Sequence, residues 1–352
     1  MISRIASAGR APSWMAAFSL VSVVAAPAVA QAPAGTTYHV VRDIALGGDG
    51  RWDYVAVDTA SRRLFIARQT RIMVVDPESG KLLGEIPGLS GAHGVALAYA
   101  AGHGFATSGH DSSVTMFDLR TLKVLRRTKA ADDADAVLYD PASKRVFTFN
   151  GDAGSSTAID PVSGDVVGTV ALGGKPEFGV TDGRGKLYVN LEDKGEVVEI
   201  EPAHLRVTRR WSIAPCEEPT GLAIDRAHHL LFSGCHNRVM AISDAAAGRK
   251  IAEVPIGEGV NAGAFDPSTQ LAFASNGDGT ITVVHEDSPT TFHVVSTAAT
   301  RRGARTMALD ERTHRLYTVT AAFGDTPAPT KEEPRPRPTL VPGTFSLLVL
   351  DR

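Results

Sequence analysis

The chain has 352 residues, with 36 lysines and arginines against 39 acidic residues and a formal net charge of −3. A mildly acidic chain lacks the general basic field that attracts nucleic acid or anionic lipid. A chain of this length usually makes two domains, but a single repeat runs through all of it, which favours one closed domain.

The first thirty residues have the composition of a cleaved secretory signal. A positive start, an apolar stretch over residues 14–26 and the small-x-small sequence of residues 28–30 are typical of such signals. The apolar stretch is too short for a membrane span, and no later apolar run is long enough to anchor the chain. We therefore expect residues 1–30 to be removed and the mature protein to be periplasmic or secreted, without a membrane span.

Seven repeats at a spacing of 40 to 44 residues follow, and in each an apolar strand ends at or beside a turn. The marker positions of the repeats are Asp58, Ala98, Asp140, Asp182, Asp225, Asp266 and Asp310. A repeat of this length with several short strands indicates a β-propeller, with one four-stranded sheet per blade. In the fourth repeat, strands are expected at residues 178–180, 186–190, 196–201 and 206–213, separated by turn residues.

The two ends of the chain complement each other. The seventh repeat has strands at residues 306–309, 315–320 and 345–350 but no fourth strand, whereas the strand at residues 38–44 belongs to no repeat. Pairing these ends closes the ring and covers both open edges. We therefore predict an all-β fold over residues 37–352: a seven-bladed β-propeller with four-stranded blades, the last closed by the N-terminal strand.

Several repeats carry copies of a short motif. Residues 187–190 read Leu-Tyr-Val-Asn, and looser copies occur at residues 146–150, 273–276 and 317–320. On these motifs the chain resembles the YncE-like family of YVTN-repeat propellers, over essentially residues 37–352. The resemblance implies an exported bacterial propeller of seven blades. It fixes no activity, because the wider family includes binding, scaffold and lyase- or lactonase-like members.

The chain contains two cysteines, Cys216 and Cys235, which flank the inner hairpin of the fifth repeat. In an antiparallel hairpin these two ends lie side by side, and disulfides persist where exported proteins reside. We therefore predict a disulfide between them. The alternatives are two free thiols, or metal ligands together with His236.

Every residue five positions before a marker is polar, although each precedes an apolar strand. These residues are Asp53, His93, Asp135, Glu177, Thr220, Asn261 and Arg305. If the first strands line a central channel, these side chains form a ring around its mouth. The first four, from Asp53 to Glu177, are ligand types for a divalent cation such as Ca²⁺, and Arg305 suits a carboxylate or phosphate. The alternative is a ring that is polar only because channel mouths are wet.

Further polar residues are expected on the same face. The loops between second and third strands hold Arg68, His110 and His236. Either histidine could act as a general base near neutral pH, although a lone loop histidine is more often simply solvated. Arg301 and Arg302 form a basic cluster with the ring arginine, which suits an anionic ligand or a short single strand of nucleic acid. No interleaved aromatic residues accompany this cluster, so nucleic acid is not favoured.

The last repeat carries a proline-rich insertion at residues 321–344, with proline and arginine alternating over residues 334–338. Proline keeps such a loop extended and lowers the entropic cost of ordering it. Long loops inside compact repeat proteins are usually functional or disordered. We interpret the insertion as a flap over the channel mouth or as a partner surface, and the alternative is a solvated loop.

The sequence contains no phosphate loop, haem-attachment motif, dinucleotide fingerprint or nucleophile elbow. Our leading hypothesis is therefore a non-catalytic, monomeric, exported propeller that binds a partner protein or a small ligand around the central channel. The second hypothesis is a metal-dependent lactonase- or lyase-like enzyme with its site at the channel mouth. The third is single-stranded nucleic-acid binding through the arginine cluster.

Overall fold

A computed structural model describes residues 1–3, 9, 35–331, 334 and 336–352. The chain divides into two compact units, Met1–Gln31 and Ala32–Arg352, and the second is described below. The expected signal over residues 1–30 lies almost entirely outside the described residues. Within the described part of the chain, we find no helix with the length and apolar character that crossing a membrane requires.

The second unit is built from antiparallel sheets, six of them within the described residues, here named A to F. Sheet A contains β1 (His39–Ala45), β26 (Ser346–Asp351), β25 (Arg315–Thr320) and β24 (Met307–Asp310). Sheet B contains β2 (Val55–Asp58), β3 (Arg63–Val75), β4 (Leu82–Ala98), β5 (His103–Ser108), β6 (Ser113–Asp118) and β7 (Val124–Lys129), with the 3-10 helix η1 (Tyr99–Ala101) after β4.

The other four sheets have four strands each. Sheet C contains β8 (Ala134–Asp140), β9 (Arg145–Asn150), β10 (Ser155–Ile159) and β11 (Val166–Ala171). Sheet D contains β12 (Pro176–Thr181), β13 (Leu187–Leu191), β14 (Glu196–Glu201) and β15 (Arg206–Ser212). Sheet E contains β16 (Pro219–Asp225), β17 (Leu230–Cys235), β18 (Val239–Asp244) and β19 (Arg249–Pro255). Sheet F contains β20 (Val260–Asp266), β21 (Leu271–Asn276), β22 (Thr280–Ser288) and β23 (Thr291–Ala299).

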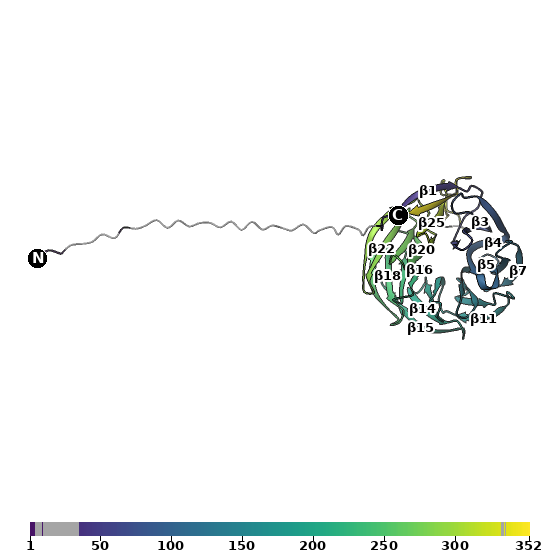
Figure 1. Cartoon of the computed structure of the whole chain (residues 1–352), viewed down its shortest axis with the longest axis horizontal. Helices are drawn as coiled ribbons and strands as arrows, with labels where there is room; N and C mark the ends of the chain where they lie inside the picture. Colours follow the sequence, from purple (N-terminus) through teal and green to yellow (C-terminus); the bar gives the residue numbers. More distant parts are fainter. Residues whose placement is uncertain (4–8, 10–34, 332–333, 335) are drawn as a thin grey trace. The chain divides into compact units, whose positions relative to one another are not determined.

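The sheets follow one another around a common centre, which makes the second unit a β-propeller (Figure 1). The first strand of each repeat contacts the first strand of the next, in the closed cycle β2, β4, β8, β12, β16, β20, β24 and β2. The second and third strands are almost entirely buried, whereas fourth strands such as β7 and β11 are mostly exposed. The strands expected in the fourth repeat correspond to β12–β15, because alternating turn residues and apolar runs specify them locally.

The prediction of seven separate four-stranded blades is wrong, because the first two repeats share the six-stranded sheet B. The reason lies in two long strands, β3 and β4, which do not break where the sequence pattern suggests. β3 pairs with β2 through its first half and with β4 through its second half. β4 then continues into the second repeat and pairs with β5. Gln69 of β3 pairs with Ala92 of β4, so the hydrogen-bonded ladder passes from one repeat to the next.

Closure by the N-terminal strand is confirmed. β1 pairs antiparallel with β26 from His39 opposite Asp351 to Ala45 opposite Ser346, and thus supplies the fourth strand of sheet A. Tyr38 stands just before β1; its hydroxyl donates to the carbonyl of His314 at 3.0 Å. The edge of β26 is therefore covered by the chain itself.

The predicted disulfide is confirmed. The sulfur atoms of Cys216 and Cys235 lie 2.03 Å apart, and their Cα atoms are separated by 5.4 Å. Cys235 ends β17 and pairs across the hairpin with Pro219, the first residue of β16. The antiparallel register therefore brings the two flanks of this hairpin together, as the sequence suggests.

Candidate functional site

Three residues of the predicted ring meet at one end of the inner strands. Asp53 stands just before β2, His93 lies in β4 and Asp135 lies in β8. The Nδ1 atom of His93 is 2.6 Å from Oδ2 of Asp53 and 3.2 Å from Oδ1 of Asp135. All three donor atoms lie within 4.8 Å of one another. We call this group the carboxylate–histidine cluster.

The electrostatics of the cluster favour a proton on the imidazole. Burial by itself lowers the pKa of His93, but the hydrogen bond with Asp53 and the carboxylates of Asp135 and Asp53 raise it to about 9. Burial raises the pKa of Asp135 well above its usual range, although the charge of His93 opposes that rise. The short contact of Nδ1 is with Asp53, and Oδ1 of Asp135 is buried without a hydrogen bond. This oxygen can therefore accept a hydrogen bond from a bound ligand or coordinate a cation.

Glu177, the fourth expected cation ligand, stands beside the cluster but is not one of its three members. Glu177 lies in β12, where its Oε1 accepts a hydrogen bond from the hydroxyl of Tyr54 at 3.4 Å. Burial, with added repulsion from Glu192 and Asp53, raises the pKa of Glu177 to about 7. A carboxyl group with a pKa near neutrality is suited to proton transfer.

The next two positions of the predicted ring are buried. Thr220 is 1 % exposed and Asn261 is 5 % exposed. The hydroxyl of Thr220 donates to the carbonyl oxygen of Val260 at 2.7 Å and so joins β16 to β20. These two side chains lie within the packed inner strands, whereas Arg305, the last ring position, is exposed.

Arg305 lines a pocket of about 350 Å³. The lining residues are Arg51, Trp52, Gly259, Gly277, Arg302, Gly303, Arg305, Phe323, Arg337 and Pro338. We call it the arginine pocket, because four of these residues are arginines and none is acidic. Among the described residues, no carboxylate forms an ion pair with any of the four, although other surface arginines such as Arg126 and Arg206 are paired. Within the described part of the chain, the pocket therefore carries positive charge without an ion-pair partner, on a protein of net negative charge.

The proline-rich insertion forms one wall of the arginine pocket. A β-bridge between Phe323 and Leu340 closes the base of the insertion. The centroids of the Phe323 and Trp52 rings lie 6.1 Å apart. The Arg302 guanidinium lies over the Phe323 ring, 5.4 Å from its centroid. Arg51 donates to the carbonyl of Pro338 at 2.9 Å. The described part of the insertion thus packs on this face through aromatic contacts and one hydrogen bond.

The arginine pocket adjoins the carboxylate–histidine cluster. Trp52 of the pocket precedes Asp53 of the cluster, and the hydroxyl of Thr306 donates to the backbone oxygen of Asp53 at 3.0 Å. The positive charge of Arg305 lowers the pKa of Glu177, against the larger effect of burial. One mouth of the propeller therefore presents an acidic side and a basic side next to each other.

The remaining candidate residues are scattered. Arg68 is fully buried, and its guanidinium donates to backbone carbonyls of residues 47–50. His110 is exposed, and His236 pairs with Glu218 at 2.8 Å. Arg301 pairs with Asp43 at 3.4 Å and is not part of the arginine pocket.

Sequence reasoning missed two residues of the pocket wall, Arg51 and Trp52. Both directly precede Asp53, the first ring residue, and an Arg-Trp pair at that place was the available signal. This signal could not predict a pocket, because Phe323, whose ring packs against Trp52, lies about 270 residues further along the chain, in the insertion. Arg335, one of the two arginines that alternate with proline in the insertion, lies outside the described residues.

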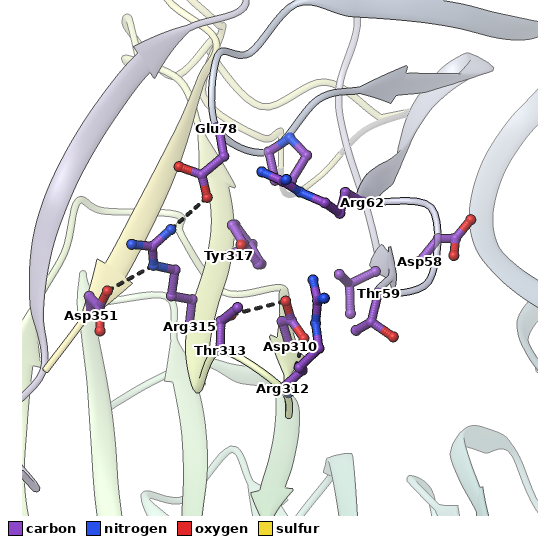
Figure 2. A pocket seen from close by; sticks show the side chains of 12 residues that line it. Asp58, Thr59, Arg62, Glu78, Asp310, Arg312, Thr313, Arg315, Tyr317 and Asp351 are labelled. Atoms are coloured by element: carbon purple, nitrogen blue, oxygen red, sulfur yellow. Dashed lines mark hydrogen bonds and ion pairs between the residues drawn. The ribbon is translucent and has the colours of Figure 1, made fainter.

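A second hollow, of about 540 Å³, lies at the other end of the inner strands (Figure 2). One of its three arginines, Arg315, is paired: Nε lies 2.8 Å from Oδ2 of Asp351, and a terminal nitrogen lies 2.5 Å from Oε1 of Glu78. The pair with Glu78 joins the last repeat to the first and helps to close the ring. This hollow is lined by four carboxylates as well as by arginines, unlike the arginine pocket.

The fold and this two-sided mouth define a β-propeller with a polar site at one end of its channel. No family model matches the chain, and no curated protein matches it. Among solved structures, hydrazine synthase of Kuenenia stuttgartiensis is similar, with a TM-score of 0.67 and 14 % sequence identity. The match covers 75 % of this chain and 91 % of that one. At this identity, the similarity supports the β-propeller fold alone.

Proposed function

We propose that this propeller binds a small anionic ligand in the arginine pocket, at the mouth of its central channel. The observation that carries the proposal is the group of four arginines that no carboxylate compensates among the described residues. Guanidinium groups bind carboxylates and phosphates in a bidentate geometry, and mutual repulsion among unpaired arginines makes an incoming anion favourable. Trp52 and Phe323 add an apolar, aromatic wall, so a ligand that carries an aromatic or flat group is favoured.

A fluorescence titration tests this proposal. Mature protein is titrated with phenyl phosphate and phthalate, with phenol as the neutral control, and Trp52 reports on binding because it lines the pocket. We expect both anions to bind, phenol to bind far more weakly, and affinity to fall as salt is added. A short single-stranded oligonucleotide is titrated in parallel, since strong salt-dependent binding of the strand would favour the nucleic-acid alternative.

The sharpest variant is the double change Arg302→Gln and Arg305→Gln. We expect at least a tenfold loss of affinity, because each charge-assisted hydrogen bond contributes about 1.5–3 kcal/mol. The matched control is Arg301→Gln, which changes a neighbouring arginine that pairs with Asp43 outside the pocket. Unchanged affinity in the double variant, or an equal loss in the control, would refute the proposal.

A second candidate function is metal-assisted hydrolysis or lyase chemistry at the carboxylate–histidine cluster. The buried oxygen of Asp135 that lacks a hydrogen bond fits a cation, as do the donor types of Asp53 and His93. A bound divalent cation would polarise a substrate oxygen there. Glu177 would transfer the proton, since its pKa is raised to about 7 by burial and acidic neighbours.

We rank this candidate second because His93 favours its protonated form, and the Nδ1 proton must leave before that nitrogen can ligate a cation. Elemental analysis of the purified protein and a turnover assay on lactones test it. Metal-dependent activity that Glu177→Ala abolishes would support the enzyme, with Glu258→Ala, an exposed carboxylate paired with Arg238, as the control. Metal-free protein without turnover would rule it out.

We also propose that the protein is exported and acts as a monomer. The support for export is the composition of residues 1–30. N-terminal sequencing of protein from the periplasm should begin at Gln31, and a retained Met1 would contradict export. Light scattering should give the mass of one chain, and a partner protein on the pocket face would appear as a co-purifying species that phthalate displaces.

A further inference from the structure

Two buried carboxylates face each other between sheets E and F, and Asp225 lies at the opposite end of β16 from the ring residue Thr220. Asp225 ends β16 and is 3 % exposed, while Glu286 lies in β22 and is 1 % exposed. His228, from the turn after β16, places its Nδ1 2.7 Å from Oδ2 of Asp225 and 2.6 Å from Oε1 of Glu286. The three donor atoms lie within 4.8 Å of one another.

The two carboxylates of this group share one positive partner among the described residues. Among the described residues, no lysine or arginine forms an ion pair with either carboxylate, and His228 is their only ion-pair partner. Both oxygens of Glu286 are buried without a hydrogen bond, although Nδ1 of His228 is close to one of them. The same Nδ1 atom also contacts Asp225, so one donor serves two carboxylates. A buried charged oxygen without a hydrogen bond is costly, so the site calls for another positive partner.

Some buried carboxylates elsewhere in this protein have a lysine or arginine partner. Asp58, the marker residue of the first repeat, pairs with Arg63 at 2.8 Å. Glu199 in sheet D accepts hydrogen bonds from Lys186 and Arg209. The fifth repeat differs because a second acid, Glu286, enters from the neighbouring sheet and no basic chain accompanies it. Other buried carboxylates without a lysine or arginine partner, such as Asp140 and Asp310, accept hydrogen bonds from neighbouring groups, whereas Glu286 has two oxygens without one.

We propose that Asp225, His228 and Glu286 bind a divalent transition cation such as Zn²⁺ or Mn²⁺. The donor set of two carboxylates and one imidazole nitrogen suits these ions better than Ca²⁺, which prefers oxygen ligands alone. The His228 side chain is 36 % exposed, which gives the ion a path from solvent and lets the ring move outward to accommodate metal–ligand bonds of about 2.1 Å. The ion ties the end of β16 to β22 and so links two neighbouring sheets.

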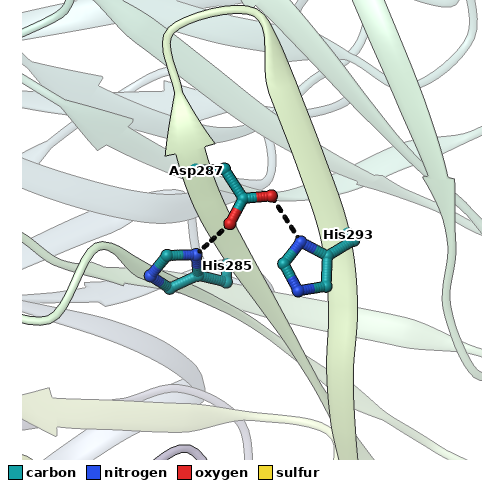
Figure 3. A group of neighbouring side chains, drawn as sticks. All are labelled: His285, Asp287 and His293. Carbon is teal, nitrogen blue, oxygen red and sulfur yellow. Dashed lines mark hydrogen bonds and ion pairs between the residues drawn. The ribbon is translucent and has the colours of Figure 1, made fainter. Parts of the chain in front are cut away.

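A neighbouring cluster on the same hairpin provides a contrast. In Figure 3, the Asp287 carboxylate lies between the imidazole rings of His285 and His293. Each of its oxygens is hydrogen-bonded to one Nδ1 atom, at 2.8 Å and 2.6 Å. This group also has three donor atoms within 4.8 Å, but it is partly exposed and its hydrogen bonds are satisfied internally. It therefore requires no ion and serves as an internal control.

The experiment is a thermal-unfolding series on mature protein treated with a chelator and then supplied with Zn²⁺, Mn²⁺ or Ca²⁺. We expect Zn²⁺ and Mn²⁺, but not Ca²⁺, to raise Tm by about 3 °C or more at saturating concentration. Direct titration with Zn²⁺ gives the stoichiometry. Glu286→Gln, which keeps the size of the side chain, and His228→Ala should each abolish the rise and reduce the stoichiometry by one.

Two controls separate this site from the others. Asp287→Asn removes the acid of the exposed cluster and should leave the rise unchanged. Asp135→Asn removes a residue of the channel mouth and should also leave it unchanged, so this proposal and the metal-dependent function can fail independently. The proposal is overturned if no transition cation raises Tm, or if Asp287→Asn abolishes the rise. It is also overturned if Glu286→Gln retains the full cation response.

Discussion

The guanidinium carbon of Arg68 lies 3.7 Å from the centroid of the Phe345 ring. Arg68 is fully buried in β3, and Phe345 immediately precedes β26. The guanidinium nitrogens of Arg68 also donate to the carbonyls of Gly47 at 3.3 Å and Gly50 at 3.1 Å. Burial, the largest cause, lowers the pKa of Arg68 to about 10. One side chain thus joins the first repeat, the last repeat and the loop that follows the closing strand.

Replacement of Arg68 by methionine should destabilise the protein strongly. The change keeps most of the apolar volume but leaves the carbonyls of Gly47 and Gly50 without their donor. We expect a loss of about 2–4 kcal/mol in the free energy of unfolding, because half-buried acceptors are left unpaired and the contact of the guanidinium with Phe345 is lost. Urea unfolding at neutral pH measures it. Arg206→Met, at an exposed pair with Glu201, should cost less than about 1 kcal/mol, and equal costs would contradict the role of Arg68.

Two glycines on neighbouring inner strands should respond differently to alanine. A Cβ atom at Gly221 in β16 would lie 2.6 Å from the carbonyl carbon of Ala262 and 2.7 Å from the nitrogen of Gly263, both main-chain atoms of β20. A Cβ at Gly263 would meet nothing closer than 3.6 Å. Gly221→Ala should therefore cost roughly 1–3 kcal/mol through overpacking, whereas Gly263→Ala should be nearly neutral. Urea unfolding measures both costs. Equal urea midpoints for the two variants would contradict the prediction, because they would show that β16 and β20 move apart at no cost in stability.

Removal of the disulfide should destabilise the fold without changing it. Replacement of Cys216 and Cys235 by serine opens a short loop, and the entropy regained by the unfolded chain corresponds to about 3 kcal/mol. The expected result is a lower urea midpoint with an unchanged circular dichroism spectrum. Reduction of the native protein should give a similar shift. A native protein in which both thiols react with a thiol reagent before reduction would contradict the bridge.

Glu199 should make stability depend on acid pH. It is 5 % exposed, and although burial would raise its pKa, hydrogen bonds from Lys186, Thr208 and Arg209 lower it below the ordinary value of 4.5. A carboxyl group with a lowered folded-state pKa stabilises the protein above its unfolded pKa, and that contribution is lost as pH falls through the folded pKa. Unfolding free energy should therefore decrease below about pH 5.

The comparison of Glu199→Gln with wild type isolates this effect. The variant should be less stable at pH 7, and its deficit should shrink as the pH falls below 4.5, because the wild-type carboxylate then loses its charge. Glu258→Gln, at an exposed pair with Arg238, is the control and should leave the pH profile unchanged. A constant deficit at every pH would show that packing, rather than charge, is the source of the stability.

The sequence by itself determined the local structure of this protein. Turn residues and apolar runs specify most strands, so β12–β15 fall where the fourth repeat predicts them, whereas β3 and β4 run through their expected breaks. The unpaired N-terminal strand and the incomplete last repeat together predicted the pairing of β1 with β26. The spacing of Cys216 and Cys235 around one hairpin predicted their bridge. Each of these features depends on short-range chemistry, or on two strand edges that have no other partner.

The tertiary structure alone decided features that depend on residues far apart in the chain. Sheet B is continuous because Gln69 pairs with Ala92, a register that no local pattern specifies, and it overturned the expected number of sheets. The same fixed offset gave His93 two carboxylate partners but buried Asn261, because the neighbouring sheets set the surroundings of each side chain. The arginine pocket exists because Phe323 of the insertion packs against Trp52. Such contacts follow from the geometry of ring closure, which is a property of the whole chain.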